Sequence, residues 1–120
     1  MCSFNAVNGV PSWANSFFMQ TLLRDIWIFD TTDIYVSTDC DITYNIPDPD
    51  VYASNQSVAA ADSIRAGADI DCGTTYQYHL NESIKAGEIT RQEIKQGISV
   101  CTRTLSVLDT LTATAASTIN

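Results

Sequence analysis

The stretch that decides the fold is Ile34-Tyr35-Val36-Ser37-Thr38-Asp39-Cys40-Asp41, in which a compact apolar, β-branched run passes directly into acidic residues. Short apolar runs of this kind are typical of parallel strands, because such strands are covered on both faces and show little polar alternation. The run ends in the acidic, proline-containing segment Thr38–Asp50. We therefore predict a buried strand over residues 34–37 that delivers a polar loop.

Strand and helix patterns alternate on both sides of this run. The other expected elements are a strand at Met1–Val7 entering a turn at Asn8-Gly9, a helix capped by Asn15 or Ser16, a helix over Val51–Ala66 stopped by Gly67, a short strand at Ala68–Ile70, a turn at Asp71-Cys72-Gly73, and a helix over Tyr76–Ala86 ended by Gly87. In the first helix we expect one buried stripe, formed by Phe17, Phe18, Leu22, Leu23 and Ile26.

This alternation predicts an α/β fold with a parallel sheet. Three strands cannot close a barrel, and a whole (β/α)8 barrel needs roughly 200 residues or more. The 120 residues therefore fit part of such a barrel, with about three strand–helix units followed by C-terminal helices.

The last third of the chain is expected to be helical. Thr90 and Glu93 form a capping box, in which each side chain satisfies a free backbone amide of the other residue. A single apolar seam is expected behind it, made of Ile94, Ile98, Cys101, Leu105 and Leu108. The Thr- and Ala-rich end, Thr110–Asn120, has little to bury, so it is expected to be frayed or disordered.

Composition excludes two classes of partner. The chain has 6 Lys and Arg against 14 Asp and Glu, a net charge of −8 and a pI near 4.2. Nucleic acids and anionic membranes both attract clustered cations, so we expect neither as a partner. No apolar run approaches the roughly 20 residues that span a bilayer. The opening MCSFNAVNG does not have the pattern of a signal peptide.

The acidic cluster after residue 37 is open to three interpretations. A carboxylate at the C-terminal end of a strand in an α/β fold faces the ligand crevice, which makes Asp39 a candidate nucleophile or base. The spacing of Asp39, Asp41, Thr43, Asn45 and Asp50 also matches a calcium loop, although Tyr44 stands where such a loop requires Gly. The third candidate is a metal site from four residues at irregular spacing, Cys40, Cys72, His79 and Cys101. Both metal alternatives are weak, and we expect no metal or other cofactor.

Three segments together carry a resemblance to a known family. They are MCSFNAVNGVPSWANSFFMQTLLRD, IYVSTDCDITYN and AAADSIRAGADIDCGTTYQY, and in this order they resemble the fungal β-xylosidases of glycoside hydrolase family 3. The resemblance runs from Met1 to about Gly97. It implies an enzyme with a (β/α)8-type barrel followed by an α/β sandwich, of which this chain resembles the last three strand–helix units of the barrel. The expected division is a partial barrel domain at residues 1–97 and a divergent helical or disordered tail at residues 98–120.

The resemblance also implies roles for particular residues. In the family a Ser-Asp-aromatic or Ser-Asp-Cys motif carries the catalytic nucleophile, and its counterpart here is Thr38-Asp39-Cys40. Asp39 would then attack the anomeric carbon of a retaining glycosidase. Phe4, Asp71 and Cys72 are implied at the substrate site. The acid/base is a Glu of the later sandwich domain in relatives, and none of Glu82, Glu88 and Glu93 matches its position.

Two departures from the family concern aromatic residues. Phe4 stands where the family has Tyr, so a hydroxyl is missing, and Trp13 stands where relatives carry a second Cys. Cys2 is therefore expected to lack its usual disulfide partner. Cys40 and Cys72 follow strands that would be neighbours in the barrel, so a bridge between them is compatible with the resemblance.

The sequence supports two hypotheses of function. The first is a β-xylosidase acting on xylo-oligosaccharides or other β-glycosides with retention of configuration. The second is that the chain as given is a catalytically inactive fragment or an interaction protein, because it holds a nucleophile without its acid. Relatives are usually secreted, which agrees with the glycosylation sequons at Asn55 and Asn81.

Overall fold

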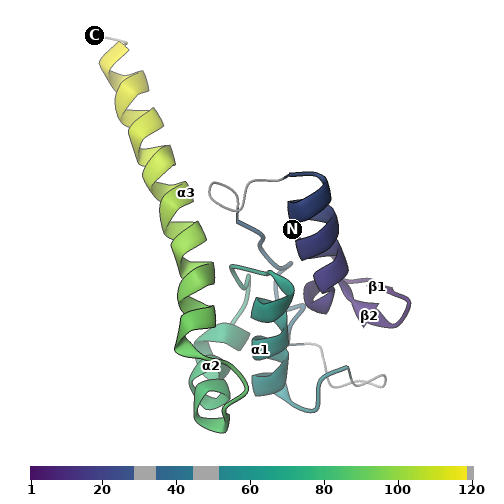
Figure 1. Ribbon diagram of the computed structural model, residues 1–120. Coiled ribbons are helices and arrows are strands. Elements are labelled where there is room, and N and C mark those ends of the chain that lie inside the picture. Colours follow the sequence, from purple (N-terminus) through teal and green to yellow (C-terminus); the bar gives the residue numbers. More distant parts are fainter. Residues whose placement is uncertain (29–34, 45–51, 119–120) are drawn as a thin grey trace.

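A computed structural model of the chain describes residues 1–28, 35–44 and 52–118, with side chains described up to residue 106. The described elements, in chain order, are β1 (Ala6–Val7), β2 (Val10–Pro11), the 3₁₀-helix η1 (Ser12–Ala14), η2 (Phe17–Ile26), α1 (Gln56–Ala66), α2 (Thr75–Ala86) and α3 (Arg91–Thr118). Helices surround a small body, and α3 projects far beyond it (Figure 1). The principal extents of the molecule are 57 × 30 × 23 Å.

Three extended segments lie parallel to one another through the body. Parallel bridges join Cys2 to Thr38 and Ser37 to Ile70, so the segment around residue 37 lies between the other two. Helix η2 follows the first segment, α1 follows the second and α2 follows the third. The predicted parallel α/β arrangement is therefore present. The predicted strands at residues 34–37 and 68–70 are reduced to single bridging residues, and Ile34 lies outside the described residues.

The first predicted strand is wrong as a single element. Cys2 joins the parallel segments, but Ala6–Val7 pairs antiparallel with Val10–Pro11 instead. The predicted turn at Asn8-Gly9 is confirmed and explains this pairing. Both of its residues have positive φ, 52° for Asn8 and 77° for Gly9, and this two-residue turn matches the twist of an antiparallel hairpin.

Helix η2 is a π-helix, in which the Trp27 N–H, for example, donates to the Leu22 carbonyl five residues back. The prediction of a helix here is confirmed, but the predicted buried stripe is wrong. Phe17 and Ile26 are exposed, and Met19 is the buried residue of this helix. The predicted stripe assumes the 3.6-residue period of an α-helix. A helix with i→i−5 hydrogen bonds has more residues per turn, so apolar residues at α-helical spacing do not all lie on one face.

Helices α1 and α2 are close to their predicted spans. Helix α1 begins at Gln56 rather than at residue 51, because the Asn55 side chain caps it by accepting a hydrogen bond from the Val58 N–H at 3.0 Å. Both helices end at the predicted glycines, Gly67 and Gly87, which adopt the left-handed conformation that favours glycine. The α2 span differs from the prediction by one residue, Thr75.

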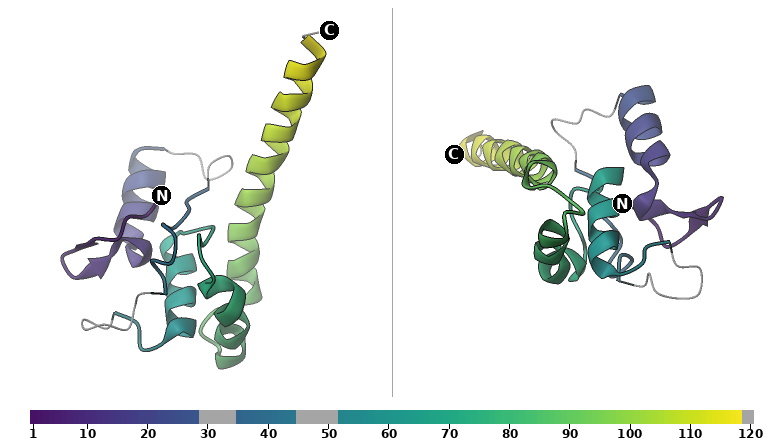
Figure 2. Two further views of the ribbon diagram at one scale, coloured as in Figure 1. Left: turned by 180° about the vertical axis from the view of Figure 1, so that it is seen from behind. Right: turned by 60° about the horizontal axis from the view of Figure 1, so that its bottom comes forward.

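Helix α3 runs unbroken across the predicted domain boundary at residues 97 and 98. Residues 110–118 are helical, so the expectation of a frayed or disordered end is wrong for them. The single apolar seam is also wrong in part. Ile98 and Leu105 are exposed, whereas Val100 is buried against the body. Two further views show that only the start of α3 contacts the body (Figure 2).

The core is built mainly from small residues of α1 and from Trp13. Ala59, Ala60 and Ala61 are almost fully buried, which lets the neighbouring helices approach α1 closely. Trp13 is 2% exposed and meets the ring of Tyr52 edge-on at 5.8 Å. Trp13 thus serves as an aromatic anchor of the core.

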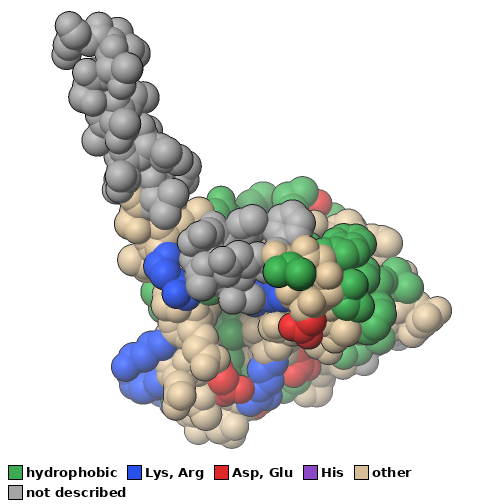
Figure 3. All heavy atoms as spheres, turned by 45° about the horizontal axis from the view of Figure 1, so that its top comes forward, with side chains coloured by type: hydrophobic (Ala, Val, Ile, Leu, Met, Phe, Trp, Pro, Cys, Tyr) green, Lys and Arg blue, Asp and Glu red, His purple; other side chains and the backbone are tan. Residues whose placement is uncertain are grey.

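Large apolar side chains also remain on the surface, where they gather on one side of the view in Figure 3. They include Phe4, Phe17, Ile26 and Trp27. Among the described residues, no helix is both long enough and apolar enough to cross a membrane.

Candidate active site

Asp39 lies at the point where the middle parallel segment ends. Its N–H donates to the Cys2 carbonyl at 3.1 Å, and the N–H of the preceding Thr38 donates to the Ile70 carbonyl at 2.9 Å. The backbone at Asp39 is therefore tied to both neighbouring segments. Its carboxylate accepts a hydrogen bond from the Cys40 N–H at 2.9 Å and is half-buried. This is a carboxylate on a fixed backbone with a face open to solvent.

The loop after Asp39 is fastened to the third segment. A disulfide joins Cys40 to Cys72, which confirms that these two cysteines can be bridged. The Asp41 N–H also donates to the Cys72 carbonyl at 2.8 Å. A Cβ on Gly73 would lie 2.9 Å from the Asp41 carboxylate and 3.1 Å from its backbone nitrogen. A glycine is therefore needed at residue 73 for this close approach.

The Asp71 carboxylate organises the interior of this loop. One oxygen accepts hydrogen bonds from the hydroxyls of Thr43 at 2.7 Å and Thr38 at 3.2 Å. The other accepts from the Tyr76 N–H at 3.2 Å, at the start of α2. The Thr38 hydroxyl oxygen in turn accepts from the Cys72 N–H at 2.9 Å. Both carboxylate oxygens of Asp71 thus have protein partners.

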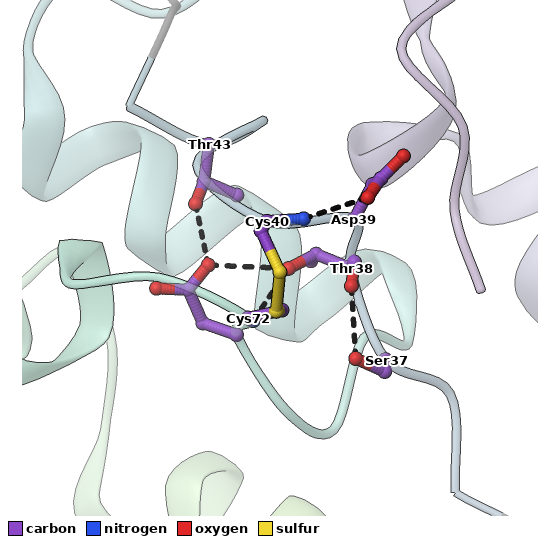
Figure 4. The surroundings of a disulfide bond; sticks show 7 residues. Ser37, Thr38, Asp39, Cys40, Thr43 and Cys72 are labelled. Atoms are coloured by element: carbon purple, nitrogen blue, oxygen red, sulfur yellow. Dashed lines mark hydrogen bonds between the residues drawn. A yellow bond between two sulfur atoms is a disulfide. The ribbon is translucent and has the colours of Figure 1, made fainter.

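Figure 4 shows the direction of the Asp39 side chain relative to the disulfide and Thr43. The side chain of Asp39 points away from the disulfide and from Thr43, whereas Thr43 points inward toward the hydrogen-bonded centre. Thr38 and Thr43 are both fully buried. The buried network therefore holds the loop, and the Asp39 carboxylate is left directed away from it.

No cation balances the carboxylates at this end of the described structure. The described ion pairs of acidic residues involve Asp69, Glu82 and Glu93, and none involves Asp39, Asp41 or Asp71.

The structure brings three of the four residues predicted for the site into one loop cluster. Asp39, Asp71 and Cys72 are linked through Thr38 and the disulfide. Phe4 lies two residues beyond Cys2, at the same end of the parallel segments as Asp39, and its side chain is 59% exposed. The exposed ring is free to meet a ligand, but no contact joins it to the cluster in the described structure.

The sequence indicates Thr38 only as part of the nucleophile motif and Thr43 only as part of the calcium spacing, and neither as a partner of Asp71. The fold brings their hydroxyls to Asp71, which lies 33 and 28 residues away in the chain. The spacing of the sequence carries no signal for such contacts.

The alternative metal sites are not supported by the described residues. The sulfur atoms of Cys40 and Cys72 are bonded to each other, so the four-residue site that included them is wrong. The calcium loop cannot be followed to its end, because Asn45 and Asp50 lie outside the described residues. Across residues 1–28, 35–44 and 52–118, no group of three or more His, Cys, Asp or Glu side chains is arranged to hold a metal ion.

The remaining cysteines follow the expectation. Cys2 and Cys101 are free, and Cys2 is buried with its sulfur 3.4 Å from that of Met19. Burial raises the pKa of the Cys2 thiol. Cys2 therefore behaves as a core residue outside any disulfide.

Two cavities of the described structure lie away from Asp39. One of about 430 Å³ lies beside Cys2 and Met19. The other, of about 460 Å³, lies between η2, α1 and α3. Asp39 lines neither of these two cavities.

The sequence of this chain is similar to those of known proteins. The chain is 61% identical over 98 residues to the exo-1,4-β-xylosidase xlnD of Aspergillus niger, and 62% identical over 98 residues to the probable exo-1,4-β-xylosidase xlnD of Aspergillus fumigatus. The chain is homologous to a segment of the fungal exo-1,4-β-xylosidases. The matches cover 82% of this chain and 12% of each relative. The resemblance predicted from three motifs is confirmed, although no family model matches the chain.

Solved structures agree with the sequence comparison. The family 3 exo-β-xylosidase XlnD, in complex with a xylobiose aziridine activity-based probe, matches with a TM-score of 0.81 and 50% identity over 88% of this chain and 14% of its own. A β-glucosidase from Erythrobacter marinus matches with a TM-score of 0.72 and 25% identity over 85% of this chain and 13% of its own. The fold of this chain therefore occurs within much longer glycosidases.

Proposed function

We propose that this chain carries the nucleophile-bearing part of a retaining β-xylosidase active site, with Asp39 as the nucleophile. The single observation that carries the proposal is the position of Asp39 at the end of a parallel segment. The chain that forms this segment matches the structure of a family 3 exo-β-xylosidase with 50% sequence identity. Backbone bonds on both sides of Asp39 aim its carboxylate, and a fixed direction is what attack on an anomeric carbon requires.

In the proposed reaction, a carboxylate oxygen of Asp39 forms a bond to the anomeric carbon of a terminal β-xylosyl residue. The glycosidic bond breaks as a separate carboxylic acid protonates the leaving oxygen. Water, deprotonated by that second carboxyl group, then releases xylose from the covalent intermediate with its configuration retained. The second carboxyl group must lie about 5–5.5 Å from the first.

Two of the three glutamates of this chain, Glu82 and Glu93, are poor candidates for that acid. Hydrogen bonds from Thr90 and from the Arg65 guanidinium lower the pKa of Glu93 to about 2, whereas a general acid needs a raised pKa. Glu82 pairs with His79 on α2. We therefore propose that catalysis uses a carboxyl group from outside residues 1–120.

Phe4, Asp71 and Cys72 are proposed to form the substrate-binding surroundings of Asp39. The exposed Phe4 ring offers an apolar face to a sugar. The Cys40–Cys72 disulfide fixes the loop that follows Asp39. Because both oxygens of Asp71 accept hydrogen bonds from the protein, we propose that Asp71 acts on the substrate through the position of Thr38 and Asp39.

The test of this proposal is a chimera, in which the 98 matching residues of the Aspergillus niger exo-1,4-β-xylosidase are replaced by those of this chain. We expect turnover of an aryl β-xyloside, and we expect Asp39→Ala to reduce kcat by on the order of 10⁴–10⁶-fold. The matched control is Asp25→Ala, an exposed aspartate on η2, which should leave kcat unchanged. Turnover that survives Asp39→Ala would refute the assignment.

The isolated 120-residue chain provides the second test. Because we propose that the acid comes from outside residues 1–120, we expect the isolated chain to be catalytically inactive on the same substrate. Turnover by the isolated chain that disappears in Asp39→Ala would contradict this expectation. Such a result would mean that the 120 residues supply the acid themselves.

We also propose that the chain functions in an oxidising, extracellular setting. The disulfide between Cys40 and Cys72 supports this, since such bonds persist in secreted proteins and are rare in the cytosol. The exposed Asn55 of the first sequon is accessible to a glycan. Mass spectrometry of the protein from its native host tests both features, and reduced Cys40 and Cys72 would contradict the proposal.

A further inference from the structure

The larger cavity, of about 460 Å³, is lined by arginines from three separate helices. Arg24 comes from the end of η2, Arg65 from the end of α1 and Arg103 from α3. The whole chain has only six Lys and Arg. Half of its cations therefore surround one cavity, although the chain as a whole is strongly acidic. Figure 3 shows basic side chains gathered along the described part of α3 and beside it.

Two of the three arginines have acidic partners in the same cavity wall. Arg24 pairs with Asp69 at 2.8 Å, and Arg65 pairs with Glu93 at 2.9 Å. Because three arginines and only two carboxylates line the cavity, one positive charge is not balanced. The cavity is thus locally cationic within a chain of net charge −8.

Arg103 carries that remaining charge. Its Nε donates to the Ser99 carbonyl at 3.3 Å, and no carboxylate of the described residues pairs with it. The outer Nη groups therefore keep their donors for a ligand. A guanidinium presents these donors as a planar fork, which matches two oxygens of a carboxylate or phosphate.

The other cations of the cavity are held in place. The Nη2 of Arg24 donates to both the Gly67 carbonyl and Asp69, and its side chain is 10% exposed. Gln20 and Gln96 add amide groups to the same wall. A volume of about 460 Å³ lies within the range of about 300–1,000 Å³ that is usual for small-molecule sites.

This cavity lies at the opposite end of the parallel segments from Asp39. Asp69, which lines the cavity, contacts Val36 near the start of the described middle segment. The Asp69 N–H donates to the Val36 carbonyl, and the Asp69 carboxylate accepts from the Val36 N–H. Asp39 and Cys72 lie at the other end. A ligand in this cavity would therefore leave the candidate active site open.

We propose that the cavity between η2, α1 and α3 binds a small oxyanion, a phosphate or a carboxylate, through Arg103. The oxyanion accepts hydrogen bonds from the free Nη groups of Arg103, and the amides of Gln20 and Gln96 contact the rest of the ligand. Arg24 and Arg65 remain paired with their carboxylates, so Arg103 supplies the net positive charge of the cavity. This inference is independent of the proposed glycosidase function.

Calorimetric titration of the 120-residue chain with inorganic phosphate and with malonate tests the proposal. Sodium chloride keeps the ionic strength constant and controls for screening. We expect saturable binding of at least one of the two anions, with a Kd below about 10 mM. Binding of phosphate alone, or of malonate alone, would support the site and identify which oxyanion it takes.

Arg103→Gln is the decisive variant, with Arg91→Gln as its matched control. Both remove one arginine charge from α3, but Arg91 does not line the cavity. We expect Arg103→Gln to weaken binding at least about tenfold and Arg91→Gln to leave it within about twofold. Gln96→Ala should weaken binding by a smaller factor, and circular dichroism confirms that each variant is folded.

Two outcomes would overturn the proposal. The first is the absence of saturable heat for both anions with the folded wild-type chain. The second is equal weakening by Arg103→Gln and Arg91→Gln, which would mean that the anions respond only to the net charge of α3.

Discussion

Asp69 and Asp71 lie two residues apart on one extended segment, yet they are stabilised in opposite ways. Asp69 meets the guanidinium of Arg24 at 2.8 Å and the Val36 N–H at 2.8 Å. Asp71 accepts only from uncharged donors, the hydroxyls of Thr38 and Thr43 and the Tyr76 N–H. The segment therefore has a cationic end at Asp69 and an anionic end at Asp71, and Asp39 belongs to the anionic end.

The comparison teaches how a chain with few cations distributes them. Arg24 pairs with a carboxylate that is well buried, since the side chain of Asp69 is only 5% exposed. Burial raises the pKa of Asp69, although the Val36 N–H and the Arg24 guanidinium act in the opposite direction. At the other end, neutral donors hold Asp71 and a disulfide provides a covalent tie. That arrangement leaves the negative charge beside Asp39 unneutralised.

The largest expected effect comes from breaking the charged pair at the cationic end. Asp69→Ala leaves the guanidinium of Arg24 buried without its partner, so we expect the free energy of unfolding to fall by about 3–5 kcal/mol. Urea denaturation followed by circular dichroism measures it. The loss at this end should exceed any single hydrogen-bond loss at the other.

The double variant Arg24→Met/Asp69→Ala is the control for this interpretation. Removing both charges should cost less than Asp69→Ala alone, because no buried charge is left unpaired. If the double variant were as destabilised as the sum of the two single variants, the pair would not be the source of the effect.

The next largest effect concerns the covalent tie at the anionic end. The disulfide closes a loop with a sequence separation of 32 residues. In the chain-entropy account, its loss in Cys40→Ser/Cys72→Ser should cost about 3–4 kcal/mol of unfolding free energy. Chemical denaturation measures this cost. Cys101→Ser, which removes a free cysteine, is the matched control and should change stability little. A similar loss in both variants would contradict the assignment.

The hydrogen bonds of Asp71 should contribute less than either of these. Asp71→Ala removes three acceptor interactions and leaves the buried Thr38 and Thr43 hydroxyls without their carboxylate, so we expect a loss of about 2–3 kcal/mol. Thr43→Val tests the network, because it should destabilise the wild type more than it destabilises Asp71→Ala. Additive losses would show that Thr43 and Asp71 act separately.

The sequence predicted the ends of elements better than their pairing. Gly67 and Gly87 stop helices, Thr90 and Glu93 form the capping box, and Asn8-Gly9 makes the turn. Each of these features depends on residues adjacent in the chain. Local backbone chemistry is therefore sufficient to predict them.

Features that depend on distant contacts were predicted less well. Residues 34–37 and 68–70 have the composition of strands, but they form only single bridges in the described structure. The stripe of η2 failed because apolar spacing cannot distinguish a π-helix from an α-helix. At the site, Asp39 was found through its motif, whereas the partners of Asp71 lie about 30 residues away and leave no local pattern.

The smallest expected effect comes from Glu93, at the start of α3 beside the cationic end. Hydrogen bonds from Thr90 and the Arg65 guanidinium lower the pKa of Glu93 to about 2 from its ordinary value of 4.5. A carboxyl group whose pKa is lower in the folded state stabilises the fold above its unfolded pKa, and this contribution is lost as the pH falls from about 4.5 toward 2. We therefore expect Glu93→Gln to lower the Tm at pH 7 and the difference from the wild type to shrink steadily between pH 5 and pH 2. Thermal unfolding across this range measures it, with the exposed Glu82→Gln as control. A Tm difference that stayed constant with pH would mean that the charge of Glu93 contributes nothing to the cap or to the pair with Arg65.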